Sequence, residues 1–429
     1  MRKQRALFYV KTVLCADGER LPTLLSGSTG IPDFDATLWV TSSLRPKNPA
    51  SATLEQALRS VALLYEVLEA RHVSLTSRLH DGIFLEPSDI EEIVIAAKRK
   101  SNEELLTKSK FNETPPSANS VISKVLSLEK LRMHPAFREK KELVKPETTA
   151  LRLGYIRAFL YWRATKEIMR SKGTRKKELI ELRDYANEII RNETPSLRNP
   201  GFLDSRMGLD EDCCSQLLVI TSIGDELNPW HGKFVQLRNQ LIISLLLATG
   251  VRRSELLGLQ VEDIDPRAQE LLVLRRPDNP ADPRVDEPNA KTRDRSLPLS
   301  SQLYQLIQQY QIERFNLLKN TKQQHRFLFI STSGKPLSKS ELNRLFRSLD
   351  GSPNLPLISP HILRHTHFEH LVGDLHAARL SDTQIMQLLR RLGGWSDTSK
   401  TPLKYIKRFI QEEAVNASLS MQSKLKIPF

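Results

Sequence analysis

The sequence contains few cysteines, and their arrangement suggests neither a disulfide framework nor a zinc site. Among 429 residues only Cys15, Cys213 and Cys214 occur, and no two of them form a CxxC pair. Small secreted domains usually carry several paired cysteines, so we expect a protein of a reducing, cytoplasmic compartment. The helical zinc motif HExxH is also absent. These absences predict a chain without a structural metal or a metal cofactor.

Long apolar runs are missing as well. The most apolar stretch, LIISLLLATGV at residues 241–251, is shorter than the roughly 18 apolar residues that a membrane span requires. The N-terminal stretch MRKQRALFYVKTVLCADGER reaches charged residues too soon for a convincing signal peptide. We therefore expect no membrane-spanning segment and no membrane partner.

Positive charge, in contrast, is abundant. The chain has 64 Lys and Arg against 50 Asp and Glu, a net charge of +14 and a pI of about 9.6. This balance favours a polyanionic partner, with nucleic acid first and an anionic membrane surface second.

The first half of the chain reads as helical after a short lead-in. Residues 7–14 and 22–25 resemble strands around an Asp-Gly turn. A helix follows from residue 53, and another is predicted over residues 148–170. The apolar face expected for the first of these helices consists of Leu54, Leu58, Val61, Tyr65 and Leu68. The face expected for the second consists of Leu151, Tyr155, Ala158, Phe159 and Trp162.

The second half shows a different pattern, which predicts an α+β domain. An apolar helix over 234–248 stops at Gly250, and strand-like segments follow at 270–276 and 295–300. The predicted organisation is therefore a mostly α N-terminal domain plus an α+β C-terminal domain. Its parts are a strand-rich lead-in (1–34), a helical domain (35–195), a linker (196–204) and a C-terminal domain with a tail (205–429).

The stretch HILRHTHFEHLV opens a helix with a cluster of polar side chains. Ser359 suits the N-cap and Pro360 the first helical position. On a helical period His361, Arg364 and His365 share one stripe with the apolar residues that follow. The cluster can be interpreted as a metal site, as a phosphate site, or as core residues whose polar groups are hydrogen-bonded within the protein. Because His367 and His370 lie off that stripe, a zinc cluster is disfavoured. His365 either assists a functional site on this helix or packs in the core beside it.

Four separated stretches of the second half carry the residue types that phosphodiester chemistry needs. Guanidinium forks such as Arg252 and Arg364 bind non-bridging phosphate oxygens, and the helix start after Pro360 adds free N–H donors. The indole N–H of Trp395 is a further donor. A leaving alkoxide needs a proton, which Lys291 could supply.

The nucleophile expected in this set is Tyr405. A phenol has an unperturbed pKa of about 10, and we expect the surrounding cations to lower that pKa, with His361 accepting the proton. The carboxylates of VEDID (261–265) could instead suggest magnesium chemistry, but their place at a helix-to-strand turn favours a capped turn.

The stretches ATGVRRSELLGL, KTRDRSLPL, SPHILRH and LGGWSD followed by Tyr405 resemble, in order, the motifs of the tyrosine recombinases, the phage-integrase superfamily with Xer- and Cre-like catalytic domains. The resemblance covers roughly residues 205–415. It implies that Arg252, Lys291, His361, Arg364 and Trp395 are catalytic and that Tyr405 is the nucleophile. Glu255 then braces the site, and His365 supports it. At position 395 most members have His, so Trp there keeps an N–H donor but removes a titratable group.

The resemblance implies a site-specific DNA recombinase or integrase that cleaves and rejoins strands through a 3′-phosphotyrosyl intermediate, without cofactor or metal. The expected partners are double-stranded DNA, a homotetramer on two DNA sites and accessory recombination proteins. The N-terminal helices would form a core-binding domain on DNA. A type IB topoisomerase-like strand transferase, a non-catalytic DNA-binding relative and a metal-dependent hydrolase are the alternatives.

Overall fold

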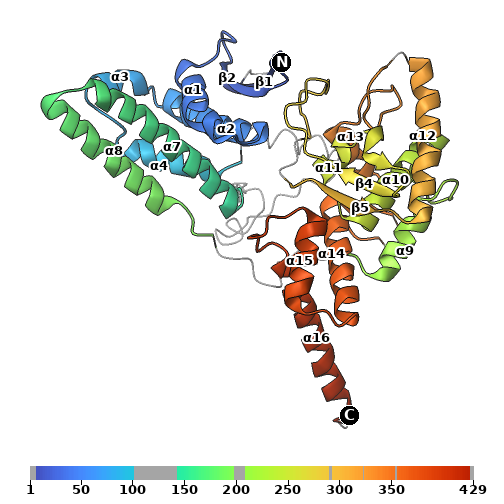
Figure 1. The fold of residues 1–429 in the computed structure, drawn as a ribbon. Helices are drawn as coiled ribbons and strands as arrows, with labels where there is room; N and C mark the ends of the chain where they lie inside the picture. The colour runs from blue at the N-terminus through green and yellow to red at the C-terminus, as the bar shows by residue number, and fades with distance from the viewer. Residues whose placement is uncertain are drawn as a thin grey trace, which may run out of the picture. The chain divides into compact units, whose positions relative to one another are not determined.

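The computed structural model describes residues 6–100, 143–197, 208–288, 292–321, 323–352 and 355–425. The chain forms two compact units, Met1–Val13 with Leu21–Asn199, and Leu14–Arg20 with Pro200–Phe429. The order of elements in these units confirms the predicted fold class, helical in the first and α+β in the second (Figure 1). The predicted linker 196–204 falls mostly outside the described residues, so it stays a prediction. None of the helices described is long and apolar enough to cross a membrane.

The first unit combines one strand pair with a group of helices. Strands β1 (Phe8–Leu14) and β2 (Arg20–Ser26) pair with each other, as predicted. The helices are α1 (Phe34–Trp39), α2 (Ser51–Ala70), α3 (Leu75–His80), α4 (Pro87–Lys98), α7 (Pro146–Arg170) and α8 (Gly173–Glu193). Helices α7 and α8 run side by side as a hairpin (Figure 1).

The core of this unit confirms one predicted helix face and corrects the other. Helix α2 buries Leu54, Leu58, Val61 and Leu68, as its periodicity indicates. Helix α7 is rotated relative to the prediction. Phe159 is buried and Tyr155 and Trp162 pack partly buried against the core, but the other apolar residues that the helix buries include Leu153, Ile156, Leu160 and Ala164. Arg163 lies on the buried side as well, and its Nε donates to Asp35 Oδ2 at 2.8 Å. A paired arginine in the core breaks the apolar pattern from which the face was predicted.

The second unit packs helices around a small antiparallel sheet. Strand β4 (Glu270–Val273) lies between β3 (Ile264–Asp265) and β5 (Arg295–Pro298), with Leu271 opposite Ile264 and Leu297. The helices are α9 (Glu211–Ile220), α10 (Lys233–Thr249), α11 (Arg253–Gly258), α12 (Ser301–Thr321), α13 (Lys339–Arg347), α14 (Pro360–Ala377), α15 (Asp382–Gly393) and α16 (Leu403–Ser423). Helix α10, apolar on nearly all sides, packs against α9, α12 and α14 and forms the centre of the core.

Local signals in the second unit agree with the structure. Gly250 ends α10 in the left-handed region (φ 58°), and Ser359 caps α14 by accepting a hydrogen bond from the Ile362 N–H. Asp263 of the VEDID stretch accepts a hydrogen bond from the Gln260 N–H at 2.8 Å and pairs with Arg276. That carboxylate therefore belongs to a capped turn, as predicted.

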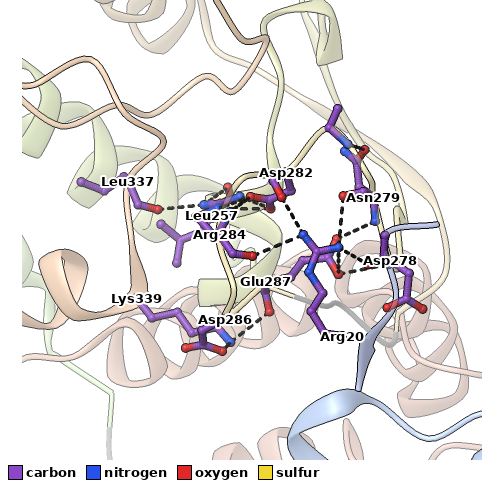
Figure 2. A network of polar contacts seen from close by, with 12 residues as sticks. Arg20, Leu257, Asp278, Asn279, Asp282, Arg284, Asp286, Glu287, Leu337 and Lys339 are labelled. Carbon is purple, nitrogen blue, oxygen red and sulfur yellow. Dashed lines mark hydrogen bonds and ion pairs between the residues drawn. The ribbon is translucent and has the colours of Figure 1, made fainter. Parts of the chain in front are cut away.

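A buried arginine from the start of the chain organises the long connection between β4 and β5. The Arg20 guanidinium donates to the carbonyl oxygens of Gly18, Asn279, Asp282 and Arg284 and lies 3.6 Å from a Glu287 carboxylate oxygen (Figure 2). Gly18 has a φ of +90°, and a Cβ added there would collide with the Asp278 carbonyl. The turn Leu14–Arg20 is therefore built into the second unit.

The same connection is anchored from its other side. Arg284 pairs with Asp282 at 2.8 Å and donates to the carbonyls of Leu257 and Leu337 (Figure 2). Glu287 accepts hydrogen bonds from the N–H groups of Asp278 and Asn279, both at 3.0 Å. A segment rich in Pro and Asp, with little apolar surface to bury, thus gains its conformation from charged hydrogen bonds.

We expect Arg20→Met to destabilise the second unit strongly. The Arg20 side chain is 1% exposed, and removing one partner of a buried ion pair costs about 3–5 kcal/mol. The measurement is the free energy of unfolding from a denaturant titration, followed by hydrogen exchange of peptides from α10. Arg326→Met is the control, since Arg326 is 76% exposed in its pair with Glu262 and should change stability by less than about 0.5 kcal/mol. Equal effects of the two substitutions would contradict the anchoring role.

Candidate active site

A buried carboxylate, Glu255, lies at the centre of the candidate site. Its Oε2 accepts hydrogen bonds from the Arg252 N–H at 2.8 Å and from Arg295 Nη2 at 2.7 Å. Its Oε1 accepts from Arg252 Nη1 at 3.2 Å, from Arg295 Nη1 at 3.1 Å and from the Thr292 hydroxyl. Burial by itself raises the pKa of Glu255, but Arg295 and the other donors outweigh it and lower that pKa to about 2. Glu255 is therefore ionised and joins α11 to β5.

The two predicted arginines converge on one carbonyl oxygen. Arg252 Nη1 donates to Gly393 O at 2.9 Å, and Arg364 Nη2 donates to the same oxygen at 3.0 Å. Arg364 also donates to the carbonyl of Gly250. Burial, together with the charge of Arg252, lowers the pKa of Arg364 to about 9, so it still carries its proton at neutral pH. The two guanidinium groups lie at a junction of four helices, where α10 and α15 end and α11 and α14 begin.

Trp395 covers both of these arginines. Its ring lies 4.6 Å from the Arg364 Cζ and 5.5 Å from the Arg252 Cζ, which is cation–π distance. Its other neighbours are the rings of Phe368 at 4.8 Å and Tyr405 at 6.1 Å. A Cβ added at Gly393 would collide with the indole, so glycine there lets the ring lie flat against the end of α15. The structure thus gives Trp395 a packing role beside the predicted N–H donor role.

The predicted nucleophile lies in the same cluster but with a raised pKa. Tyr405, in the first turn of α16, is 2% exposed and lies 5.5 Å from the Phe368 ring. Burial raises the pKa of Tyr405 to about 12, although the charges of Arg364 and Arg252 lower it. The expectation that the surrounding cations bring this pKa below 10 is therefore wrong. Burial removes the solvation of the phenolate and outweighs the attraction of the cations.

Two histidines connect the exposed start of α14 to the phenol. His361 Nε2 and His365 Nε2 are 3.1 Å apart, and the His365 ring lies 5.6 Å from the Tyr405 ring. Burial and the charge of Lys404 lower the pKa of His365 to about 3. His365 is therefore neutral at physiological pH and lies between His361 and the tyrosine, so it belongs to the site rather than to the core alone.

The remaining histidines of this helix have other partners. His367 Nδ1 is 2.9 Å from the Leu247 carbonyl, and a ring nitrogen of His370 is 2.8 Å from the Leu209 carbonyl. These contacts fasten α14 to α10 and to the residues before α9. The split between His361 and His365 on one side and His367 and His370 on the other agrees with the predicted stripe.

Two residues of the site were not singled out from the sequence, and one predicted residue lies outside the described part. Arg295 and Thr292, the partners of Glu255, were missed. Arg295 is buried like Leu297 on β5 and Leu299 just after it. An arginine on the inward face of a strand signals a buried acidic partner. Lys291 falls outside the described residues, immediately before Thr292.

The site therefore combines two guanidinium groups, one buried and one partly exposed, with a buried phenol and the adjacent imidazoles of His361 and the neutral His365. The guanidinium forks can hold a tetrahedral or trigonal-bipyramidal anion by its oxygens. The phenol can attack such an anion, and an imidazole can accept its proton. This combination suits displacement at phosphorus.

Comparisons with known proteins agree with this chemistry. Residues 219–412 match the model of the phage integrase family. Tyrosine recombinase XerD of Halalkalibacterium halodurans is 30% identical over 181 residues, which cover 39% of this chain and 55% of that protein. Tyrosine recombinase XerC of Staphylococcus haemolyticus is 30% identical over 138 residues, which cover 32% of this chain and 41% of that protein. The chain spans about half the length of these relatives.

A solved structure of XerH site-specific recombinase bound to difH substrate, in a pre-cleavage complex, is similar over 89% of this chain and 93% of that one. Its sequence identity is 16% and its TM-score 0.44.

Loss of the Glu255 charge should lower stability at neutral pH. A carboxylate with a pKa of about 2 in the folded chain and an ordinary pKa when unfolded stabilises the fold above pH of about 4.5, and this contribution is lost as the pH falls toward 2. We therefore expect the melting temperature of the second unit to fall between pH 5 and pH 3. Glu255→Gln should melt lower at pH 7 and show a weaker fall across that range. An unchanged melting temperature at pH 7 would contradict the bracing role.

Proposed function

Because residues 219–412 belong to the phage integrase family, we propose that this chain is a tyrosine-type site-specific DNA recombinase. The observation that carries the proposal is that Trp395 lies against Arg252, Arg364 and the ring of Tyr405, so that these four side chains form one cluster. The positive charge of the chain supports double-stranded DNA as the substrate. The curated relatives named tyrosine recombinases support the same activity.

In the proposed reaction Tyr405 Oη attacks a scissile phosphorus. A bond forms between Oη and phosphorus, the bond from phosphorus to the 5′ oxygen breaks, and the cleaved strand ends as a 3′-phosphotyrosine with a free 5′-hydroxyl. Arg252 and Arg364 hold the non-bridging oxygens, whose negative charge grows during attack. Attack by the 5′-hydroxyl of a partner strand reverses the step and rejoins the DNA, so the energy of the original bond is retained.

The raised pKa of Tyr405 determines at which point in the reaction its proton leaves. A phenol with a pKa of about 12 is neutral at pH 7, so its proton leaves during attack rather than before it. The neutral His365, in contact with His361, is the acceptor that we propose. Lys291 is proposed to protonate the departing 5′ oxygen, on the strength of its place before Thr292 in the KTRDRSLPL motif.

The first unit is proposed to bind DNA around the site of cleavage. Lys172, Lys176 and Lys177 are exposed at the turn between α7 and α8 and at the start of α8. Cations placed in this way contact phosphates rather than bases, so they would add affinity without sequence preference.

Assembly into a homotetramer on two DNA sites is proposed to use the end of α16. Beyond Phe409 this helix extends away from the rest of the second unit (Figure 1), with Ile410, Val415 and Leu419 between 49% and 57% exposed. A groove of about 600 Å³ between α9, α10, α12 and α14 offers apolar surface for such a helix from a neighbouring copy. The leucines that line it are Leu218, Leu247, Leu303, Leu306 and Leu371.

Covalent capture on DNA tests the activity. We expect the full chain to form an SDS-resistant adduct with a library of nicked duplexes randomised on both sides of the nick, because loss of the short fragment prevents rejoining. The adduct should form in the presence of EDTA, and Tyr405→Phe should abolish it. The captured duplexes then define the site. No adduct from the wild type, or an adduct from Tyr405→Phe, would refute the assignment, and an adduct lost only with EDTA would favour a metal-dependent enzyme.

Joining of two sites distinguishes a recombinase from a topoisomerase-like strand transferase. Two copies of the captured duplex on one plasmid should recombine, whereas a strand transferase of the topoisomerase type would only relax the plasmid. A non-catalytic relative would bind the duplex and do neither.

Deleting residues 417–429 should leave single-site binding intact while cooperative binding and recombination fall together. Leu419→Ser tests the same contact with one side chain. Burying a leucine contributes roughly 1.5–3 kcal/mol, so the assembly should weaken about tenfold or more. Gln411→Ser, an exposed polar change on the same helix, is the control and should behave as wild type. Full recombination by the truncated chain would contradict docking of the tail.

A further inference from the structure

Helix α16 is attached to its own unit through its first two turns only. Tyr405, Ile406 and Arg408 are buried, and Phe409 stacks on the His376 ring with centroids 4.3 Å apart. From Ile410 to Leu425 every residue of this segment is exposed. The position of the proposed nucleophile therefore depends on a few contacts at the start of the helix.

One of these contacts is a largely buried ion pair. Arg408 Nη1 lies 2.9 Å from Glu369 Oε1 on α14, and the two side chains are 9% and 16% exposed. Arg408 Nε also donates to Glu412 at 2.8 Å, but that carboxylate is 51% exposed. Solvent weakens the contact with Glu412 much more than the contact with Glu369.

The Glu369 carboxylate is held in place from its other side. Its Oε2 accepts a hydrogen bond from the Gly208 N–H at 2.8 Å, while Oε1 accepts from Arg408. The chain at Gly208 passes so close to α14 that an added Cβ would lie 2.8 Å from Thr366 Cα. With both oxygens engaged, the carboxylate presents a fixed direction to the arginine.

The ion pair lies one helical turn from the chemistry. Glu369 follows His365 by four residues on α14, and Arg408 follows Tyr405 by three on α16, so each pair shares a helix face. The ring contact of His365 with Tyr405 and the ion pair of Glu369 with Arg408 are successive contacts between the same two helices. A rotation of α16 that moves Tyr405 would break the ion pair.

We propose that Glu369 and Arg408 are positioning residues for the nucleophile. Their directional contact holds the first turns of α16 against α14, so that the phenol stays beside Arg252 and Arg364. This inference rests on the proposed function, because it takes Tyr405 as the attacking residue. Apolar contacts alone allow a helix to slide or turn, whereas a charged hydrogen bond between fixed groups sets both position and rotation.

The test measures adduct formation on the captured nicked duplex in a single turnover, with the full chain and over a range of enzyme concentrations. Arg408→Met should slow the rate at saturating enzyme by about 100-fold, since a displacement of about 1 Å can cost this much. The enzyme concentration at half saturation should not change, because the ion pair lies outside the proposed DNA contacts. Arg408→Lys, which keeps the charge, should recover part of the rate.

Three further variants separate positioning from a general loss of packing. Glu412→Gln removes the exposed partner of Arg408 and should react at the wild-type rate within about twofold. Glu369→Gln should be slow, because it removes the largely buried countercharge of Arg408 and leaves the exposed Glu412. Glu369→Gln combined with Arg408→Met should react faster than the product of the two single effects predicts, because neither buried charge is then unpaired.

Melting temperatures of all variants show whether the unit remains folded. A folded Arg408→Met protein with the wild-type rate, or strictly multiplicative single and double effects, would overturn the inference while the proposed function stands. A wild-type chain that forms no adduct would overturn both. Partial recovery by Arg408→Lys together with a slow, folded Arg408→Met supports positioning by the charged pair.

Discussion

The candidate site depends on the ionised carboxylate of Glu255. Arg252, Arg295 and Arg364 lie close together and would repel one another, and burial alone disfavours the charges of Arg252 and Arg364. Glu255 binds Arg252 and Arg295 directly, and the Gly393 carbonyl accepts from Arg252 and Arg364. One acidic side chain therefore allows three cations to stay charged where a phosphate would bind.

The same arrangement explains why the phenol of Tyr405 is neutral in the folded chain. Tyr405 is buried among aromatic rings, and its raised pKa keeps the proton on the oxygen until an acceptor takes it during attack. The neutral His365 beside it suits such an acceptor, because a protonated imidazole could not receive a proton. In the proposed reaction, cations near the phenol would stabilise the charge that develops more than they ionise the resting residue.

Contacts between segments that are distant in the sequence fix the position of the residues that flank this site. Arg20 organises the connection between β4 and β5, whose far end supplies Thr292 and Arg295 to Glu255. Gly208 and Arg408 share the carboxylate of Glu369 on α14. In each case a buried charge bridges segments that have little apolar surface in common, and directional hydrogen bonds replace the packing that such segments lack.

The sequence by itself determined the local features. Gly250 as the end of α10, Ser359 and Pro360 as the start of α14, the two strands around the Asp-Gly turn and the stripe of His361, Arg364 and His365 all follow from short-range sterics and helical periodicity, which neighbouring residues specify. The order of the four motifs named most of the residues that the fold brings together, but it did not name Arg295 or Thr292. Lys291 lies outside the described residues.

Only the tertiary structure decided which charges are buried and what they meet. The face of α7 was wrong because Arg163 reaches Asp35, 128 positions away. The pKa of Tyr405 was wrong because burial, which no spacing of residues reveals, outweighs the nearby cations. The partners of Arg20 lie about 260 residues along the chain. Solvation and long-range pairing depend on how segments pack, and a linear pattern specifies neither.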